Sequence, residues 1–264
     1  MNIMDQKILS RIDGAVATLT FNNPERHNAM SLEMWQAATT ALVALIDDPA
    51  VRVIVLTGAG GKAFVSGADI SKFESERASA DGVATYNAAV ESFSKILYDC
   101  SQATIAMIRG YCIGGGIGIA VCCDLRLATE NSRFGVPAAK LGLGYGMESL
   151  RRLMQLIGPQ FTAEMLFTAR QFDATEAAQM GLINRVLPES EIESYVADMA
   201  QTIAGNAPLT IRATKRIIRE LLRDGIVRDT HKCDSLVDAC FESEDYREGR
   251  RAFLEKRKPV FKGK

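Results

Sequence analysis

The chain has 264 residues, enough for one large domain or for a core domain with an appendage, but few for two full domains. Hydrophobic residues make up 47% and charged residues 24%, which is typical of a soluble globular protein and excludes disordered and collagen-like chains. The formal net charge of -1 gives no whole-protein basis for nucleic-acid binding, so a small-molecule partner is expected.

The small numbers of histidines and cysteines narrow the possible classes of function further. The only histidines are His27 and His231, which limits metal-hydrolase, Ser-His and Cys-His chemistry, and no metal site is predicted. The cysteines show no C-x-x-C spacing and are interpreted as small core residues in a reducing compartment. With no signal-peptide pattern and no apolar stretch of about 18 residues, a cytoplasmic protein that does not bind membranes is expected.

In chain order, the first half alternates strands and helices. Alternating β-branched residues predict a strand at 15–21, and Ser31 is the expected N-cap of a helix over 32–48. Apolar and β-branched runs predict further strands, at residues 51–58, 104–110 and 125–129. The polar segment 71–82 is expected to be a mobile loop that could act as a lid, followed by a helix over 83–99. This order predicts a layered α/β fold.

Beyond residue 147, amphipathic helices predominate. Asp173 and Glu176 form a capping-box pattern at the start of one helix, which Gly181 can end. Two later helices are predicted at 209–223 and 244–258. From residue 208 onward, 15 basic and 10 acidic residues leave a local positive excess that suits either a solvated helix face or an anionic ligand.

Glycine is concentrated in one segment: nine of the 21 glycines lie between Gly110 and Gly146. The cluster matches neither the dinucleotide pattern G-x-G-x-x-G nor the phosphate loop G-x-x-x-x-G-K-[ST]. What remains is a pair of strand-to-helix turns, at 62–70 and 111–124, each expected to present unpaired backbone N–H groups. If the turns converge, they could polarise one carbonyl oxygen from both sides; close packing of helix on strand is the alternative interpretation.

Six segments, in order from residue 12 to residue 261, resemble the crotonase (enoyl-CoA hydratase/isomerase) superfamily: NPERHNAMS, KAFVSGADI, GYCIGGGIGIAVCCDLRLA, RFGVPAAKLGLGYG, FTARQFDATEAAQMGLINRV and SEDYREGRRAFLEKRKPVF. The resemblance implies a superhelical core of stacked ββα turns over residues 1–200 and a C-terminal helical trimerisation region over 201–264. It also implies a homotrimer or a hexamer of two trimers. The implied substrate is an acyl-CoA thioester, with coenzyme A as part of the substrate and no tightly bound cofactor.

The resemblance assigns an oxyanion hole to the backbone N–H groups of Ala68 and Gly115, which would stabilise a thioester enolate. The residues expected at the coenzyme A are Arg26, His27, Ala29, Lys62, Ala63, Ser66, Asp69, Ile70, Phe253 and Lys256. The alternative to coenzyme A binding is a structural role in its turn for Asp69, and simple solvent exposure for His27 and Lys62.

The family pattern breaks at two positions. Hydratases of the family carry glutamates in G-G-G-x-E and F-G-x-P-E, where this chain has Gly118 and Ala138. Efficient water addition by that route is therefore not expected. Tyr145 replaces the proline of L-G-x-x-P-G and resembles a tyrosine of the methylmalonyl-CoA decarboxylase branch, with simple packing as its alternative role.

Three carboxylates remain as candidates near the acyl group. Glu148 could act there or only stabilise a helix N-terminus, and Glu74 and Glu76 lie in the expected lid. The prediction is an acyl-CoA lyase or isomerase of the enoyl-CoA hydratase/isomerase type, with a reaction that needs no paired glutamates, such as decarboxylation. The alternative is an acyl-CoA binding protein without catalysis.

Overall fold

The computed structural model describes residues 6–72, 75–76, 79–223 and 227–264, and its centre is a six-stranded sheet. Its first two strands are antiparallel and the other neighbours are parallel. The two central strands, β3 and β5, are buried along their whole length, which their continuous apolar sequences permit. In spatial order the strands are β1 (Ile8–Asp13), β2 (Val16–Phe21), β3 (Val53–Gly58), β5 (Ala103–Ile108), β7 (Leu125–Thr129) and β10 (Arg185–Leu187).

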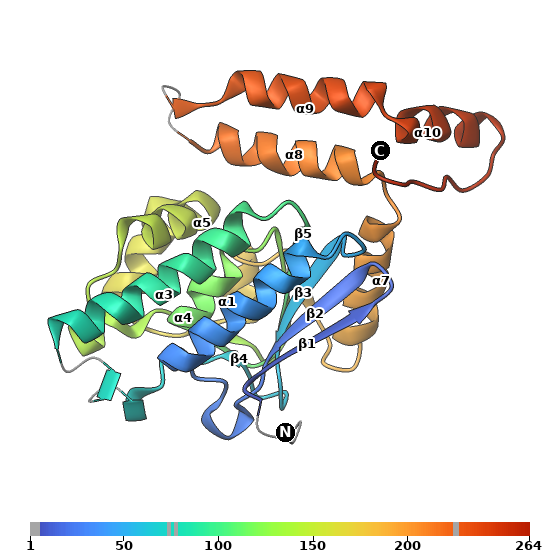
Figure 1. Cartoon of the computed structure of the whole chain (residues 1–264). Helices are drawn as coiled ribbons and strands as arrows, with labels where there is room; N and C mark the ends of the chain where they lie inside the picture. The colour runs from blue at the N-terminus through green and yellow to red at the C-terminus, as the bar shows by residue number, and fades with distance from the viewer. Residues whose placement is uncertain (1–5, 73–74, 77–78, 224–226) are drawn as a thin grey trace.

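Helices cover both faces of this sheet (Figure 1). On one face lie α1 (Leu32–Asp47) and α3 (Ala80–Asp99), and on the other lies α7 (Ile192–Ala204). Alternation along β3 decides which side chain faces which layer: Ile54 joins the core with Trp35, while Val55 joins the core with Val196. The layered α/β prediction is confirmed.

A smaller sheet runs beside the large one, with β4, β6 and β8 parallel and the short β9 antiparallel. Each of its first three strands follows a strand of the large sheet, so the chain repeats a strand-strand-helix unit, as the expected ββα core requires. The elements of this region are β4 (Ala63–Val65), β6 (Tyr111–Ile113), α4 (Gly115–Ala120), β8 (Arg133–Gly135), α5 (Met147–Thr168), β9 (Phe172–Asp173) and α6 (Ala174–Gln179).

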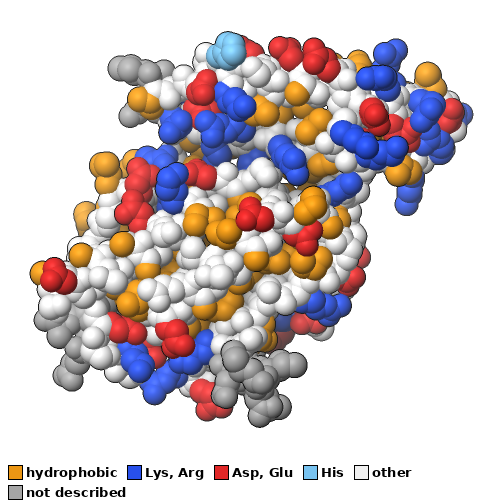
Figure 2. Space-filling model, viewed as in Figure 1, with side chains coloured by type: hydrophobic (Ala, Val, Ile, Leu, Met, Phe, Trp, Pro, Cys, Tyr) orange, Lys and Arg blue, Asp and Glu red, His pale blue; other side chains and the backbone are white. Residues whose placement is uncertain are grey.

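The C-terminal helices form a layer of their own beyond the sheets (Figure 1). Many of the lysine and arginine side chains on the face in Figure 2 lie over this layer. The expected division between residues 200 and 201 falls within α7, which is buried as far as Ala204. The three helices are α8 (Pro208–Leu221), α9 (Thr230–Glu242) and α10 (Glu244–Leu254).

Several local features differ from the predictions. In the polar segment 71–82, the 3-10 helix Ile70–Lys72 precedes residues 73–74, and the Ser79 side chain caps α3, so the described parts of the segment are not loop throughout. Residues 73–74 and 77–78 of the expected lid lie outside the described residues. Strand β1 and helix α9 were not anticipated. The last helix ends at Leu254 rather than at residue 258. Beyond it, Arg257 and the backbone N–H of Val260 both donate to Glu248, which draws the chain back along α10.

The predicted core location of the cysteines is confirmed for four of the six residues. Cys100, Cys112, Cys122 and Cys123 are buried, whereas Cys233 and Cys240 are only partly buried, and all six are free thiols. Across the described residues, none of the helices has both the length and the apolar character needed to cross a bilayer.

Candidate active site

Two glycine-containing turns meet at the ends of β4 and β6. The strands are parallel neighbours, so the chain leaving each reaches the same edge of the small sheet. Gly67 and Gly114 have φ angles of 111° and 53°, which favour glycine. A Cβ atom on Gly115 would lie 3.9 Å from the Gly67 backbone, and one on Gly116 would lie 2.2 Å from the Val65 oxygen. The turns therefore converge, which is the condition stated for their joint action on one carbonyl oxygen.

Each turn offers one backbone donor, and both lie at this junction. The N–H of Met30 donates to Gly67 O at 2.8 Å and the N–H of Asp69 donates to Met30 O at 2.9 Å, so the N–H of Ala68 between them faces away from Met30. Gly115 is the first residue of α4, where an N–H has no acceptor within the helix. Within the described chain neither N–H has a hydrogen-bond acceptor. Such a pair of donors suits negative charge developing on an oxygen atom.

Tyr145 lies beside the second turn. Its hydroxyl donates to Gly114 O at 3.3 Å, next to the N–H of Gly115. The side chain is half-buried and packs on the core, and this burial raises the pKa of Tyr145 to about 12. The phenol is therefore a neutral proton donor at physiological pH.

The two positions at which the resemblance expects glutamates lie in different surroundings. Gly118 is one turn along α4 from Gly114, and a Cβ atom there would meet nothing within 4 Å. Ala138 is only 8% exposed, in the 3-10 helix Pro137–Leu141. Open space thus lies on α4 at the position where the resemblance expects a carboxylate.

The candidate carboxylates have other partners. Glu148 opens α5 and is exposed; Arg151 donates to it at 2.8 Å and holds the pKa of the Glu148 carboxyl below its usual range. Glu76 accepts the N–H of Leu32 at 3.1 Å, at the start of α1. Glu74 lies outside the described residues. These contacts favour structural roles for Glu148 and Glu76. Within the described segments, no group of three or more His, Cys, Asp or Glu side chains is arranged to hold a metal ion.

The loop expected to face coenzyme A is joined to the first turn. Arg26 donates to Ser71 Oγ at 2.7 Å and lies 3.5 Å from the buried Asp69, which also accepts the Ser71 hydroxyl. The Ser66 N–H donates to the carbonyl of His27 at 3.1 Å, and the exposed His27 ring packs edge-on against Tyr111. The orienting role considered for Asp69 agrees with these contacts.

The other predicted residues of this region differ in exposure. Ile70 is 65% exposed and Lys62 is also exposed, so both side chains are open to a ligand. Ala63 and Ala29 are buried, at 1% and 8% exposure, so neither side chain is open to a ligand. The structure thus brings eight of the ten predicted coenzyme A residues to two joined segments.

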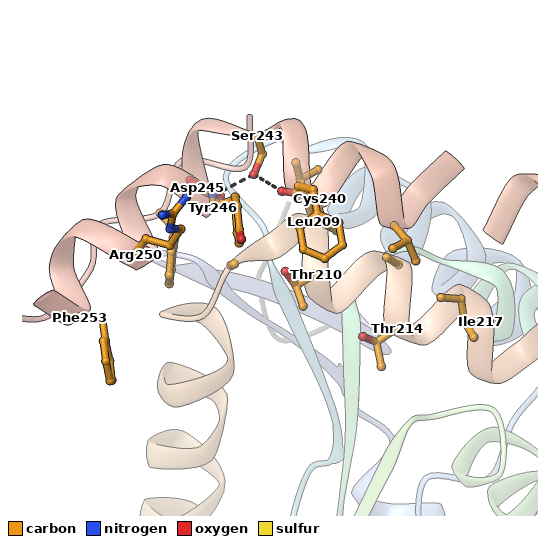
Figure 3. Close-up of a pocket in the computed structure, with 16 residues that line it drawn as sticks. Leu209, Thr210, Thr214, Ile217, Cys240, Ser243, Asp245, Tyr246, Arg250 and Phe253 are labelled. Atoms are coloured by element: carbon orange, nitrogen blue, oxygen red, sulfur yellow. Dashed lines mark hydrogen bonds between the residues drawn. The ribbon is translucent and has the colours of Figure 1, made fainter. Parts of the chain in front are cut away.

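Phe253 and Lys256 are not part of this group. They belong to α10 and the turn after it, and Figure 1 places α10 at the opposite end of the molecule from β4. Phe253 is 83% exposed and borders an apolar pocket of about 580 Å³ between the C-terminal helices. In Figure 3, Leu209 of α8 and Tyr246 of α10 line the same pocket. One copy of the chain therefore does not bring Phe253 and Lys256 to the two turns.

Comparison with known proteins adds an independent line of evidence. The family model described as enoyl-CoA hydratase/isomerase matches residues 11–264. A crotonyl-CoA hydratase from Syntrophomonas wolfei is 33% identical, with 97% of this chain and 98% of the relative covered. A short-chain-enoyl-CoA hydratase from Clostridium acetobutylicum is 32% identical, over 93% and 94% of the two chains. The crystal structure of an enoyl-CoA hydratase/carnithine racemase from Magnetospirillum magneticum superposes with a TM-score of 0.92 at 37% identity, covering 98% of this chain and 96% of the other.

Proposed function

Because this chain belongs to the enoyl-CoA hydratase/isomerase family and has the crotonase fold, we propose that it stabilises an acyl-CoA thioester enolate through the N–H groups of Ala68 and Gly115. The observation that carries the proposal is the pair of acceptor-free N–H groups at the junction of the two turns. Coenzyme A enters as part of the substrate, and the mechanism requires no tightly bound cofactor.

The proposed reaction is one that generates the enolate without paired glutamates, since Gly118 and Ala138 replace them. Loss of CO₂ from a malonyl-type thioester meets this condition. The bond from the α-carbon to the carboxylate breaks, and its electron pair becomes the enolate held by the two N–H groups. A proton then reaches the α-carbon; the neutral phenol of Tyr145 is the candidate donor, and water returns the proton to it.

Coenzyme A is proposed to lie over the two joined segments that contain Arg26, His27 and Lys62, whose side chains are exposed. Phe253 and Lys256 would then reach coenzyme A only from a neighbouring copy. That geometry supports a homotrimer, or a hexamer of two trimers, assembled through the C-terminal helices.

A second candidate is an acyl-CoA binding protein that has lost catalysis. It is favoured by the absence of a side-chain carboxyl at positions 118 and 138 and by the separate engagement of Glu76 and Glu148. Turnover separates the two candidates, because both predict binding of acyl-CoA.

The test is incubation of the purified protein with crotonyl-CoA and with methylmalonyl-CoA, followed by mass spectrometry. We expect loss of CO₂ from the second ester and little hydration of the first. Tight binding without turnover of any ester would leave only the binding protein.

Tyr145→Phe is expected to lower kcat by about 10- to 100-fold, because it removes the phenol proton without changing the ring. Steady-state kinetics with the ester that turns over measures this effect. An unchanged kcat would remove Tyr145 from the mechanism, and an unchanged rate in Ala68→Pro would contradict the oxyanion assignment.

A further inference from the structure

A tryptophan side chain packs against the second turn of the candidate site. Trp35, on α1, is only 2% exposed. A Cβ atom placed on Gly115 would lie 3.4 Å from Trp35 Cζ2, so the indole contacts the backbone of the residue that supplies one N–H donor. Cζ2 and Nε1 are both bonded to Cε2 of the indole. The edge of the ring that faces Gly115 therefore also carries its one polar atom.

Two hydrogen bonds connect this edge of the indole to the first turn. Trp35 Nε1–H donates to the Tyr86 hydroxyl at 2.8 Å, and that hydroxyl donates to the carbonyl oxygen of Met30 at 3.1 Å. The backbone of Met30 is also hydrogen-bonded to the residues on both sides of Ala68. The direction of the Ala68 N–H thus depends on where Met30 is held.

The groups in this chain of contacts are buried and have little freedom to move. Tyr86 is 4% exposed and Met30 is fully buried. Phe93, which follows Tyr86 by two turns of α3, packs edge-on against Trp35 with ring centroids 5.5 Å apart. A shift of the indole would leave a buried N–H without its acceptor and would break the contact with Phe93, and both changes are unfavourable.

The indole therefore touches one turn and is hydrogen-bonded, through one hydroxyl, to the segment that holds the other. Two N–H groups stabilise an oxyanion only when both are aimed at the same oxygen, because a hydrogen bond weakens steeply as its angle departs from linearity. The spacing of the two donors is accordingly a property of α1 and α3 as well as of the turns.

We propose that Trp35 and Tyr86 are positioning residues that set the separation and direction of the N–H groups of Ala68 and Gly115. Both side chains are buried, so they act through the backbone and not on the substrate. The inference rests on the proposed acyl-CoA function, and it extends the oxyanion hole to two side chains on helices outside the turns.

The test is isotope-edited infrared spectroscopy of propionyl-CoA labelled with carbon-13 at the thioester carbonyl. This ester is the product of CO₂ loss from methylmalonyl-CoA and has no carboxylate to lose, so it stays intact when bound. In the unmodified protein, the carbonyl stretch should lie at a lower frequency than in water, because two fixed donors polarise the bond. Tyr86→Phe should reduce this displacement by about half, as expected when one of two donors is misaligned.

The affinity of the ester separates positioning from a general loss of structure. By calorimetry, the dissociation constant of propionyl-CoA should stay within about threefold in Tyr86→Phe, because coenzyme A supplies most of the contacts. Tyr98→Phe is the matched control: Tyr98 lies on the same helix and is 7% exposed, but its ring packs against Arg152 and Arg219 rather than the turns. It should keep the full displacement.

The outcomes distinguish the inference from the function on which it rests. A full displacement in folded Tyr86→Phe, or the same reduction in Tyr98→Phe, overturns the positioning roles and leaves the acyl-CoA function standing. If the unmodified protein does not bind the ester, or binds it without displacement, the oxyanion hole fails and the inference fails with it.

A second measurement needs no variant and decides even if Tyr86→Phe does not fold. Trp35 is the only tryptophan of the chain, so intrinsic fluorescence reports on this position alone. Its emission in the unmodified protein should differ between saturation with propionyl-CoA and saturation with coenzyme A, because only the ester places an oxygen at the two N–H groups. Identical emission with the two ligands overturns the coupling between the indole and the turns.

Discussion

Two glycines of α4, Gly116 and Gly118, differ in the space available for an added side chain. Gly118→Ala should raise the free energy of unfolding by about 0.5–1 kcal/mol, because the site is open and alanine favours the helix. Gly116→Ala should lower it by about 1–3 kcal/mol, because the added Cβ would lie 2.2 Å from the Val65 oxygen. Urea unfolding followed by circular dichroism, at one protein concentration, measures both effects. Equal shifts in the two variants would contradict this description of the turn.

Tyr145 couples stability to alkaline pH. The ordinary pKa of tyrosine is about 10, and burial raises that of Tyr145 to about 12. The folded state thus favours the protonated phenol. The resulting stabilisation is complete below pH 10 and is lost as the pH rises towards 12. Between these limits the unmodified protein should lose stability relative to Tyr145→Phe, by on the order of 1 kcal/mol. Urea midpoints at pH 8 and pH 11 test this. An equal change of midpoint in the two proteins would show that the phenol is solvated.

At the scale of elements, the capping box of α6 is a local device with a measurable contribution. Asp173 accepts the N–H of Glu176 at 2.8 Å, and Glu176 accepts the N–H of Asp173 at 3.0 Å. Asp173→Ala should therefore cost about 1 kcal/mol of stability. Thr175→Ala, an exposed change within the same helix, should stay within about 0.5 kcal/mol. Thermal denaturation compares them, and a similar loss in both would argue against the cap.

Elements with strong local signals could be predicted from the sequence, and weaker ones could not. Strand β7 was predicted at its observed ends, and Ser31 caps α1 as expected, accepting the N–H of Met34. The edge strand β1 was missed because its last four residues are exposed and include the charged Arg11 and Asp13. It is stabilised by its antiparallel pairing with β2. The helix α9 was missed because none of its residues in the described structure is buried, which leaves a weak apolar stripe.

The arrangement of the whole molecule decides which predicted site residues can act together. Convergence of the two turns could be stated only as a condition, because the parallel strands β4 and β6 that bring them together lie inside the segments predicted as turns. The burial of Arg152 was not predictable, since in the sequence it is one of two adjacent arginines on an amphipathic helix. Only the packing of α5 on Cys122 and Tyr98 distinguishes it from Arg151, which is partly exposed and pairs with the exposed Glu148. Long-range packing of this kind leaves no local mark in the sequence.

Separation of Phe253 and Lys256 from the turns leads to a prediction about assembly (Figure 1). If Lys256 contacts coenzyme A bound to a neighbouring copy, Lys62→Glu and Lys256→Glu damage different sides of each site. Each variant alone should bind acetyl-CoA weakly. Co-expressed, the two chains should form mixed oligomers in which about a quarter of the sites combine an intact turn with an intact C-terminal segment.

Calorimetry of the co-expressed protein should then give about a quarter of the stoichiometry of the unmodified protein at near-normal affinity. Light scattering of the same sample should give a mass of three or six copies of the 28.8-kDa chain. Binding no better than the average of the two variants would mean that each chain uses its own C-terminal segment or none. A monomer by light scattering would exclude the shared site, because Lys256 then has no second copy to contact.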